Sequence, residues 1–402
     1  MKRTGFGLLI CGCFWLFCFG IVNTTSAAEK IKWGATLDMS GPTSDMASQV
    51  AWGFIDCLRF ANTRGGVNGK EVILEVVDHK YDVKLGVATY ERFKQDKDIL
   101  GIFMQGTGIA FALLPKNNKD KFVVIGTNLD APMTVGTKYP YNFCLGPTYS
   151  DLARTAIKYM VDNSVSDKPK ICFVRPKGRY GDSPVKAIKM YAEDLGIEPP
   201  QAIVVPWGSL DTTSQVLVMK KIKPEFVYIT LTAMNAAVVL KDAMRYGFKS
   251  QFIADVRTIS EHMSYYAQDA AEGYMGLSQY ATFNTPVPGI EDVKEAAMKY
   301  RKAKYLTKQL IFPYVEGYCY GLTVLEALKR ADDKGNLTRV GVKEALETLD
   351  NFQLGGLYPG VTFTKADHRG SILSKMYQIK NKEMVPITGW LSPSDDPKYI
   401  GK

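Results

Sequence analysis

The stretch IKWGATLDMSGP, residues 31–42, opens an alternation of strand and helix patterns that decides the fold. Residues 31–37 form a short apolar run typical of a buried strand, and the turn-forming residues that follow end it. Residues 49–62 then carry apolar side chains at helical spacing, and residues 71–78 alternate as a strand does. A strand, a helix and a second strand in this order predict a βα unit on a parallel sheet.

The same alternation continues through most of the chain. Further strands are predicted at 99–104, 122–127, 170–174, 202–205, 226–230 and 252–254, and further helices at 85–93, 110–114, 152–161, 184–195, 216–222, 236–246 and 263–271. The units fall into two sets, 31–147 and 150–276. Because one core stops growing at roughly 250–300 residues, a chain of 402 residues is expected to form two domains. Each set predicts an α/β lobe with helices on both faces of a parallel sheet.

The last third of the chain has a different pattern. Helices are predicted at 293–304, 313–331 and 340–349, followed by a hairpin at 376–380 and 384–388 that turns at Asn381-Lys382. These strands are too few for a third domain, so we expect helices and edge strands added to the two lobes. The predicted lobes are 29–148 plus 277–355 and 149–276 plus 356–402. Several crossings between two lobes make a hinge, and a hinge makes a cleft.

The N-terminus has the features of a secretory signal peptide. Lys2 and Arg3 precede an apolar run at 8–22, and small residues end at Ala28, after which we expect cleavage. The chain is therefore expected to be exported to the periplasm. An uncleaved membrane anchor and a lipoprotein attached near Cys11 are the weaker alternatives, because the apolar run is short for a span and starts too late for a lipoprotein.

Composition argues against several classes of partner. The formal net charge is +9, but the charges are interspersed without a long basic run, so no nucleic-acid partner is expected. The chain has 3 His, and the cysteines outside the predicted signal peptide fit no zinc or redox spacing: Cys57, Cys144, Cys172 and Cys319. We expect buried free thiols, with one disulfide as the alternative, and neither a metal nor a cofactor.

The motif with the strongest chemical character is Gly106-Thr107-Gly108, which follows a predicted strand and opens a predicted helix. With Asp130 further on it is close to a dinucleotide-binding fingerprint, but Phe111 takes the position of the third glycine. Free N–H groups at a helix start also favour an anion. The chain has no nucleophile-elbow, phosphate-loop or zinc-protease motif, and the sequence supports no acid/base pair for catalysis.

The order and spacing of these segments resemble the periplasmic solute-binding proteins of ABC transporters, in the branched-chain amino-acid (type I, Venus-flytrap) family. The resemblance is carried by residues 31–42, by Gly65-Gly66-Val67-Asn68-Gly69, by Arg179-Tyr180-Gly181 and by Tyr246-Gly247-Phe248. It implies an α/β fold of two doubly wound parallel-sheet lobes joined by multiple hinge crossings. It also implies that the lobes close over a ligand in the cleft between them.

The resemblance further implies a set of ligand-binding residues. The loops after the third and fourth strands would hold a ligand carboxylate, Met46 would line the wall of the first lobe, and Tyr180 would close over the ligand. The candidates are Met46, Gln105, Gly106, Thr107, Gly108, Asn128, Asp130, Tyr149, Tyr180, Thr232 and Asp255. Asp130 or Asp255 could pair with an α-ammonium group, whereas Arg175, Arg179 and Arg257 would favour an anionic ligand.

The function implied is that of a monomeric receptor that delivers a small ligand to the membrane permease and ATPase subunits of an ABC importer. A branched-chain or related amino acid is the leading ligand, with aromatic or other carboxylates, small amides and peptides as rivals. A secreted α/β enzyme and a sensory ligand-binding module for an organic acid are the alternatives from other classes.

Overall fold

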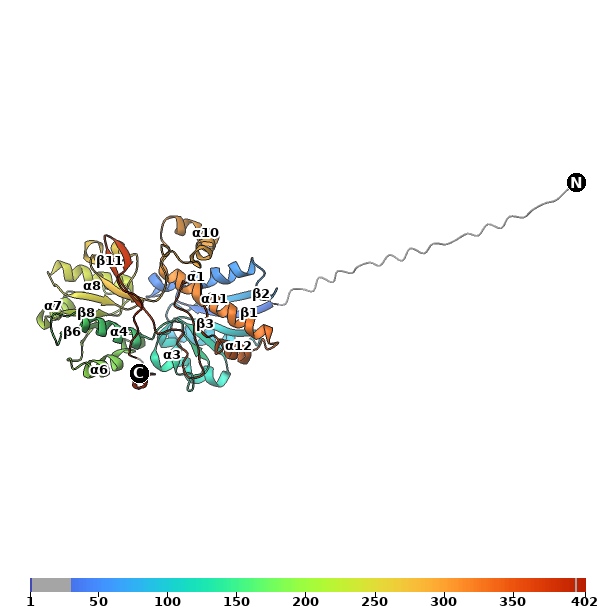
Figure 1. Cartoon of the computed structure of the whole chain (residues 1–402), viewed down its shortest axis with the longest axis horizontal. Coiled ribbons are helices and arrows are strands. Elements are labelled where there is room, and N and C mark those ends of the chain that lie inside the picture. The colour runs from blue at the N-terminus through green and yellow to red at the C-terminus, as the bar shows by residue number, and fades with distance from the viewer. Residues whose placement is uncertain (2–29, 395) are drawn as a thin grey trace.

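The computed structural model describes residue 1, residues 30–394 and residues 396–402. The predicted signal peptide falls almost entirely on residues 2–29 and so lies outside the described part of the chain. Two lobes lie side by side, each built on a sheet that helices cover (Figure 1). Within the described ranges, none of the helices has both the length and the apolar character that a membrane span requires.

Lobe 1 contains the first sheet, with strand order β2-β1-β3-β4-β5 and parallel pairing throughout. Its strands are β1 (Lys30–Leu37), β2 (Glu71–Asp78), β3 (Ile99–Met104), β4 (Val123–Gly126) and β5 (Asn142–Phe143). Its first helices are α1 (Ser44–Asn62), α2 (Val83–Gln95) and α3 (Thr107–Asp120). The βα units predicted from residues 31–127 are confirmed, because the buried apolar strands alternate with amphipathic helices as their periods require.

Lobe 2 contains a second sheet, with strand order β12-β11-β10-β9-β8-β6-β7. Its strands are β6 (Ile171–Arg175), β7 (Gln201–Val204), β8 (Phe226–Ile229), β9 (Gln251–Ala254), β10 (Met275–Ser278), β11 (Lys375–Lys380) and β12 (Glu383–Pro386). Its helices are α4 (Tyr149–Asp162), α5 (Arg179–Asp182), α6 (Val185–Asp194), α7 (Thr213–Ile222), α8 (Ala233–Arg245) and α9 (Met263–Tyr266). The first five strands pair in parallel, whereas β11 and β12 form the predicted antiparallel hairpin.

The turn of this hairpin has the conformation that suits its twist. Asn381 and Lys382 have φ angles of 52° and 68°. Two consecutive residues with positive φ match a type I′ turn, whose twist follows that of the paired strands. The hairpin thus extends the edge of the lobe 2 sheet, as predicted from the sequence.

The C-terminal helices return to lobe 1. They are α10 (Ile290–Leu306), α11 (Phe312–Asp333) and α12 (Arg339–Leu346), and α11 lies along α1 (Figure 1). Bridges then join Val135 to Asp367 and Cys144 to Arg369, so the chain stays against lobe 1 until about residue 370. The final crossing to lobe 2 therefore comes later than the expected boundary at residue 356.

Helices α1 and α11 approach each other at two glycines. A Cβ atom on Gly53 would lie 1.9 Å from the Tyr314 carbonyl oxygen, and one on Gly317 would lie 1.9 Å from the Val50 carbonyl oxygen. No side chain fits at either position, so the two backbones touch. Beside this contact the Phe54 ring stacks on Phe103 of β3 at 4.2 Å between centroids. The contact fixes α11 relative to the first helix and the sheet of lobe 1.

The four cysteines of the described chain are buried and free, as the spacing predicted. Burial raises the pKa of the Cys172 thiol to about 11 and that of the Cys57 thiol well above its usual range, which keeps both protonated. Over the same described residues, no group of three His, Cys, Asp or Glu side chains is arranged to hold a metal ion.

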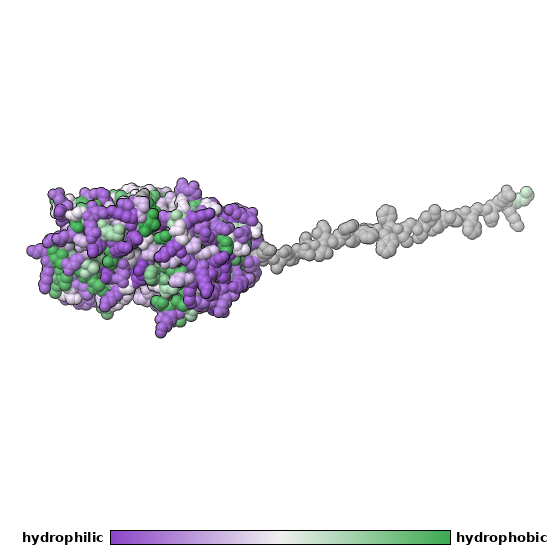
Figure 2. Space-filling view, turned by 90° about the horizontal axis from the view of Figure 1, so that it is seen from below, coloured by the Kyte–Doolittle hydropathy of each residue, from purple (hydrophilic) through white to green (hydrophobic). Residues whose placement is uncertain are grey.

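The surface is mostly polar where it can be seen in Figure 2. On that face hydrophilic side chains predominate, and the hydrophobic ones form separate small groups. Large exposed apolar residues, such as Val165 and Leu210, are scattered along the sequence. Scattered apolar residues of this kind are normal for a globular surface and point to no particular partner.

The glycine contact between α1 and α11 gives a stability prediction. We expect Gly317→Ala to lower the free energy of unfolding by about 1–3 kcal/mol, because the added methyl group forces two backbones apart. Urea unfolding followed by circular dichroism measures the change. Gly108→Ala is the control, since a Cβ atom there meets nothing within 4 Å. Equal losses of stability in the two variants would contradict the proposed backbone contact.

Candidate functional site

A cavity lies between the lobes, where the carboxyl ends of strands from both sheets meet. Its lining residues are Thr43, Met46, Ala47, Val50, Tyr81, Gln105, Gly106, Thr107, Thr127, Tyr149, Tyr180, Thr232 and Arg257. The cavity volume is about 50 Å³. In open α/β sheets the crevice outside the carboxyl ends of the strands is the usual place for a ligand, which makes this cavity the candidate site.

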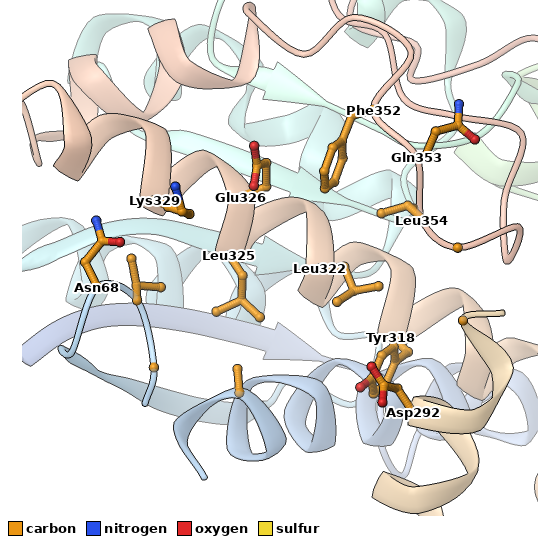
Figure 3. A pocket seen from close by; sticks show the side chains of 15 residues that line it. Asn68, Asp292, Tyr318, Leu322, Leu325, Glu326, Lys329, Phe352, Gln353 and Leu354 are labelled. Atoms are coloured by element: carbon orange, nitrogen blue, oxygen red, sulfur yellow. The ribbon is translucent and has the colours of Figure 1, made fainter. Parts of the chain in front are cut away.

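A larger hollow of about 320 Å³ is lined by residues of lobe 2 alone, and two more, of about 500 and 550 Å³, lie on the outer surfaces of the molecule. Figure 3 shows the hollow of about 500 Å³, where α11 carries Leu322 and Leu325 and the loop after α12 contributes Phe352 and Leu354. The hollow of about 550 Å³ lies beside Arg154 and the C-terminal residues. None of the three is at the strand ends where both lobes contribute side chains, so the cavity between the lobes is the stronger candidate despite its small size.

The start of α3 forms one wall of the cavity. Gly106 has a φ of 100°, which lets the chain turn sharply from β3 into the helix at Thr107. Ile109 and Ala110 donate their N–H groups to the Gly106 carbonyl, whereas the first N–H groups of a helix have no intrahelical acceptor. The helix start therefore presents hydrogen-bond donors and the partial positive charge of the helix dipole to the cavity.

Gln105 supports this turn. Its Oε1 accepts the Asp38 N–H at 2.9 Å, and its Nε2 donates to the Ala47 carbonyl at 2.9 Å. The Gln105 carbonyl lies 2.9 Å from His79 Nε2. Both polar ends of the buried Gln105 side chain are thus engaged within the protein. The side chain connects β3 to the end of β1 and to α1.

Tyr149 connects the helix start to lobe 2. Its hydroxyl lies 3.4 Å from the Thr127 carbonyl and also hydrogen-bonds the side chain of Thr107. Burial raises the pKa of Tyr149 to about 12 although the positive charge of Arg257 lowers it, so the hydroxyl keeps its proton at neutral pH. Thr107 and Arg257 therefore both lie close to one protonated hydroxyl.

Aromatic rings from both lobes form another wall. The Tyr180 ring lies edge-on to Tyr149 at 4.9 Å and stacks on Trp207 at 6.1 Å, with 23° between the planes. Tyr81, from the loop after β2, contacts the same Trp207 at 6.3 Å. The Tyr81 backbone has a φ of 59° and donates its N–H to His79 Nδ1 at 2.9 Å, which fixes this unusual conformation.

Arg257 is the one cation in the lining as the structure describes it. Its guanidinium donates to both carboxylate oxygens of Glu316 on α11, at 2.6 and 2.5 Å. Glu316 is fully buried, and the Arg257 side chain is 11% exposed. Among the described residues Arg257 Nε has no hydrogen-bond partner. The pair links the lobes and leaves one guanidinium N–H free beside the cavity.

The two carboxylates predicted to face a ligand amine are engaged elsewhere. Asp255 accepts hydrogen bonds from the Tyr180 hydroxyl at 3.0 Å, from Thr258 Oγ1 at 2.7 Å and from the Arg257 N–H at 2.9 Å. It is fully buried, and burial raises its pKa to about 6. It lies behind Tyr180 and does not line the cavity.

Asp130 joins the lobes instead of facing the cavity. Its Oδ2 accepts Arg179 Nε at 2.6 Å, and its Oδ1 accepts the Ser183 hydroxyl at 2.6 Å. The Arg179 guanidinium also lies 4.0 Å from the ring centroid of Phe111 on α3. Arg175, by contrast, pairs with Asp182 within lobe 2. All three arginines that the sequence placed at the rim thus pair with carboxylates of the protein, and of these Arg257 lines the cavity.

Two further carboxylates span the lobes at helix N-termini. Asp45 of α1 accepts the Met234 N–H at the start of α8, at 3.1 Å. Glu261 of lobe 2 accepts the Phe312 N–H at the start of α11, at 2.9 Å. A carboxylate is favoured at a helix N-terminus by the free N–H groups and by the dipole. Each lobe therefore offers a carboxylate to a helix of the other.

The structure brings most of the sequence-predicted residues together. Those in the lining are Met46, Gln105, Gly106, Thr107, Tyr149, Tyr180 and Thr232, whereas Gly108, Asn128, Asp130 and Asp255 lie outside it. Asn128 donates from Nδ2 to the Met104 carbonyl at 3.0 Å and so braces two strand ends. This geometry gives each candidate a place, and their role toward a ligand stays a prediction.

Other lining residues were not among the candidates. Thr43, Ala47 and Val50 share the face of α1 that Met46 was expected to present, and their spacing of four and three residues was the available signal. Tyr81 and Thr127 follow β2 and β4, at positions where loop residues at strand ends meet a ligand. Arg257 was noted near the rim but not chosen.

Comparison with known proteins decides the family. A family model described as "Periplasmic binding protein" matches residues 30–383. The chain belongs to the periplasmic binding protein family. A Leu/Ile/Val-binding protein homolog from Brucella abortus is 24% identical over 305 residues, which is 74% of this chain and 78% of the relative. The Leu/Ile/Val-binding protein of Citrobacter freundii is 25% identical over 272 residues, 66% of this chain and 71% of the relative.

Solved structures confirm the type I periplasmic binding protein fold. A branched-chain amino acid ABC transporter protein from Thermus thermophilus with bound valine has a TM-score of 0.84 at 23% identity, covering 90% of this chain and 97% of that one. A fatty acid ABC transporter substrate-binding protein from Thermomonospora curvata has a TM-score of 0.82 at 24% identity, with 91% and 93% covered. The predicted class, two α/β lobes joined by several crossings, is therefore correct.

The Asp130 contacts give a prediction about lobe separation in this periplasmic binding protein. We expect Asp130→Asn to weaken the contact with Arg179 and to raise the radius of gyration of the ligand-free protein, measured by small-angle X-ray scattering. Asp182→Asn is the control, because Asp182 pairs with Arg175 inside lobe 2. An unchanged radius in Asp130→Asn would show that this ion pair does not hold the lobes together.

Glu261 gives a prediction about pH. Burial raises its pKa to about 7, so the folded protein binds this proton more tightly than the unfolded chain does. The stability contributed by the proton is fully present below about pH 4.5 and is lost as the pH rises through about 7. We expect the melting temperature to fall less between pH 5 and pH 8 in Glu261→Gln than in the wild type, by roughly 2 °C or more.

The matched control for the pH series is Glu198→Gln, which changes an exposed carboxylate. It should leave the pH dependence of the wild type unchanged. If Glu261→Gln gave the same slope as Glu198→Gln, Glu261 would not titrate in this range. Differential scanning fluorimetry over the pH series is sufficient for the measurement.

Proposed function

We propose that this periplasmic binding protein is the ligand receptor of an ABC importer and that it holds a small carboxylate-bearing ligand in the cavity between its lobes. The observation that carries the proposal is the convergence of hydrogen-bond donors on this cavity: the start of α3 at Thr107 and the Arg257 guanidinium, whose Nε–H has no partner among the described residues. A carboxylate offers about four acceptor positions and suits such a set of donors.

The names of the relatives support a carboxylate. The Brucella and Citrobacter proteins are named for leucine, isoleucine and valine, the Thermus structure holds valine, and the Thermomonospora protein is named for fatty acids. Every ligand in these names carries a carboxylate, although the remainder of the ligand differs. We therefore propose only the shared carboxylate, and no particular carbon skeleton, for the ligand of this protein.

The proposed mechanism is ligand-dependent closure of the lobes. Thr107 and Thr127 belong to lobe 1, whereas Tyr180 and Arg257 belong to lobe 2, so a ligand touches both groups only when the lobes are together. A ligand favours one state by the difference between its affinities for the two states. Contacts made only in the closed state supply this difference, and no reaction is required.

The proposed location and partners follow from the family and from the sequence. The predicted signal peptide would export the chain to the periplasm, where it would act as a monomer. The permease and ATPase subunits of the importer would be the partners, with the permease contacting the closed form. An enzyme on the same scaffold and a sensory module are the alternatives that the ligand experiment separates.

A ligand panel tests the proposal. We expect a carboxylate ligand present at about 1,000 times its Kd to stabilise the protein by about 4 kcal/mol, which thermal shift detects as a higher melting temperature. Screening should include branched-chain amino acids, aromatic and aliphatic acids, amides and short peptides. Chemical consumption of a bound compound during incubation would favour the enzyme alternative and contradict the receptor function.

Variants of the cavity locate the binding site. Thr107→Val removes a hydroxyl at the start of α3, and Tyr180→Ala removes the ring that stacks on Trp207, so each should weaken a carboxylate hit at least tenfold in isothermal titration calorimetry. Thr63→Val is the control, because Thr63 is exposed at the C-terminal end of α1. Unchanged affinity in both cavity variants would place the ligand elsewhere.

A further inference from the structure

We infer that the ligand is a small carboxylate without an α-ammonium group, so that the site selects organic acids over the amino acids that share their carbon skeleton. The inference rests on the proposed function, since it specifies the ligand of the same cavity. It departs from the leading expectation of a branched-chain amino acid, and four properties of the cavity carry it.

The described lining contains no carboxylate for an ammonium group to pair with. Of the acids outside the lining, Asp255 is engaged with Tyr180 and Thr258, and Glu316 with Arg257. Asp45 accepts the Met234 N–H through Oδ2, and its other oxygen has no partner among the described residues. Asp130 is held by Arg179 and Ser183 between the lobes. An ammonium group moved into this cavity would lose water without gaining a counter-charge, which is costly in a buried site.

Backbone carbonyls at the strand ends are occupied as well. The Leu231 carbonyl lies 2.9 Å from the Tyr180 hydroxyl and 2.7 Å from the Thr258 hydroxyl, and because each hydroxyl has one proton, Leu231 shares these two donors with Asp255. The carbonyls of Gln105 and Thr127 are contacted by His79 and Tyr149. Each of these three carbonyls therefore already has at least one donor of the protein within hydrogen-bond distance.

Donors, in contrast, are in surplus. The Arg257 Nε–H has no partner among the described residues, and its charge is the one formal charge in the lining. The N–H groups at the start of α3 lie around the same space, beside the Thr107 and Tyr149 side chains, whereas the Tyr149 hydroxyl proton is donated to the Thr127 carbonyl. This distribution complements an anion with acceptor oxygens and repels a second cation beside Arg257.

The remainder of the cavity limits the carbon skeleton. Met46, Ala47 and Val50 give an apolar surface on α1, and the Tyr180 ring lies among the other lining residues. A volume of about 50 Å³ equals the space of only a few water molecules at roughly 10–15 Å³ each. A single aromatic ring or a short branched chain therefore fits better than a peptide or a long acyl chain.

Matched ligand pairs that differ only in the α-ammonium group test the inference. The pairs are leucine with 4-methylpentanoate and phenylalanine with 3-phenylpropanoate, and isothermal titration calorimetry on the full processed chain measures each Kd. We expect the acid without the ammonium group to bind at least about tenfold more tightly in at least one pair. Equal or tighter binding of the amino acid in both pairs would overturn the inference while leaving the proposed receptor of carboxylates intact.

The other outcomes separate the two proposals. If no acid and no amino acid bound while 4-methylpentanamide did, the carboxylate assignment itself would fail, and the inference with it. If none of these probes bound, with benzoate and valine included, both proposals would be contradicted for ligands of this size. Weaker binding of the amide than of the acid supports the role of Arg257.

A gain-of-function variant adds an independent readout. Thr127→Asp places a carboxylate in the lining, and we expect it to shift the preference in each pair toward the amino acid by at least tenfold. Thr127→Asn is the matched comparison, because its side chain has the shape of Asp without the charge; any change in affinity should be the same for both members of a pair, with no shift toward the amino acid. Circular dichroism and melting temperature confirm that both variants fold. An unchanged preference in a folded Thr127→Asp protein would overturn the assignment of charge complementarity to this cavity.

Discussion

The backbone contact between α1 and α11 is the constraint on which the site depends. It is made at Gly53 and Gly317, and Glu316, the neighbour of Gly317, reaches Arg257 of the other lobe. A buried ion pair is tolerated only with good geometry and full hydrogen bonding, because both charges lose their hydration. Packing of two helices in lobe 1 therefore decides where the single described cation of the cavity lies.

The contacts between the lobes share one chemical form. Asp45 and Glu261 each bind an N–H group in the first turn of a helix in the opposite lobe, and Asp130 binds Arg179 and Ser183. The carboxylate oxygens that make these contacts between the lobes are not free to bind a ligand. The same carboxylates thus join the lobes and lie outside the lining of the cavity. The lining of the closed arrangement is therefore rich in donors and favours a negatively charged ligand.

The spacing of apolar residues predicted the fold, because buried strands and amphipathic helices each require a characteristic spacing and this chain follows both closely. The candidate loop at Gly106-Thr107 was also predictable, since a strand followed by glycine and a helix start has few conformations. The partners of Asp130 and Asp255 were not predictable, because Arg179 and Thr258 reach them only through the tertiary arrangement. Tyr81 was missed for a similar reason: its positive φ is stabilised by His79, and sequence spacing gives no sign of that hydrogen bond.

The interleaved path of the chain has a consequence for how the protein folds. The face of α1 that packs against α11 stays uncovered until α11 has been synthesised. The sheet of lobe 2 receives β11 and β12 only near the end of the chain. Neither lobe can complete its core from a continuous N-terminal segment, so many native contacts join residues far apart in sequence. Loop closure of this length slows folding. The chain should therefore reach its native state late, with both lobes maturing together rather than one after the other.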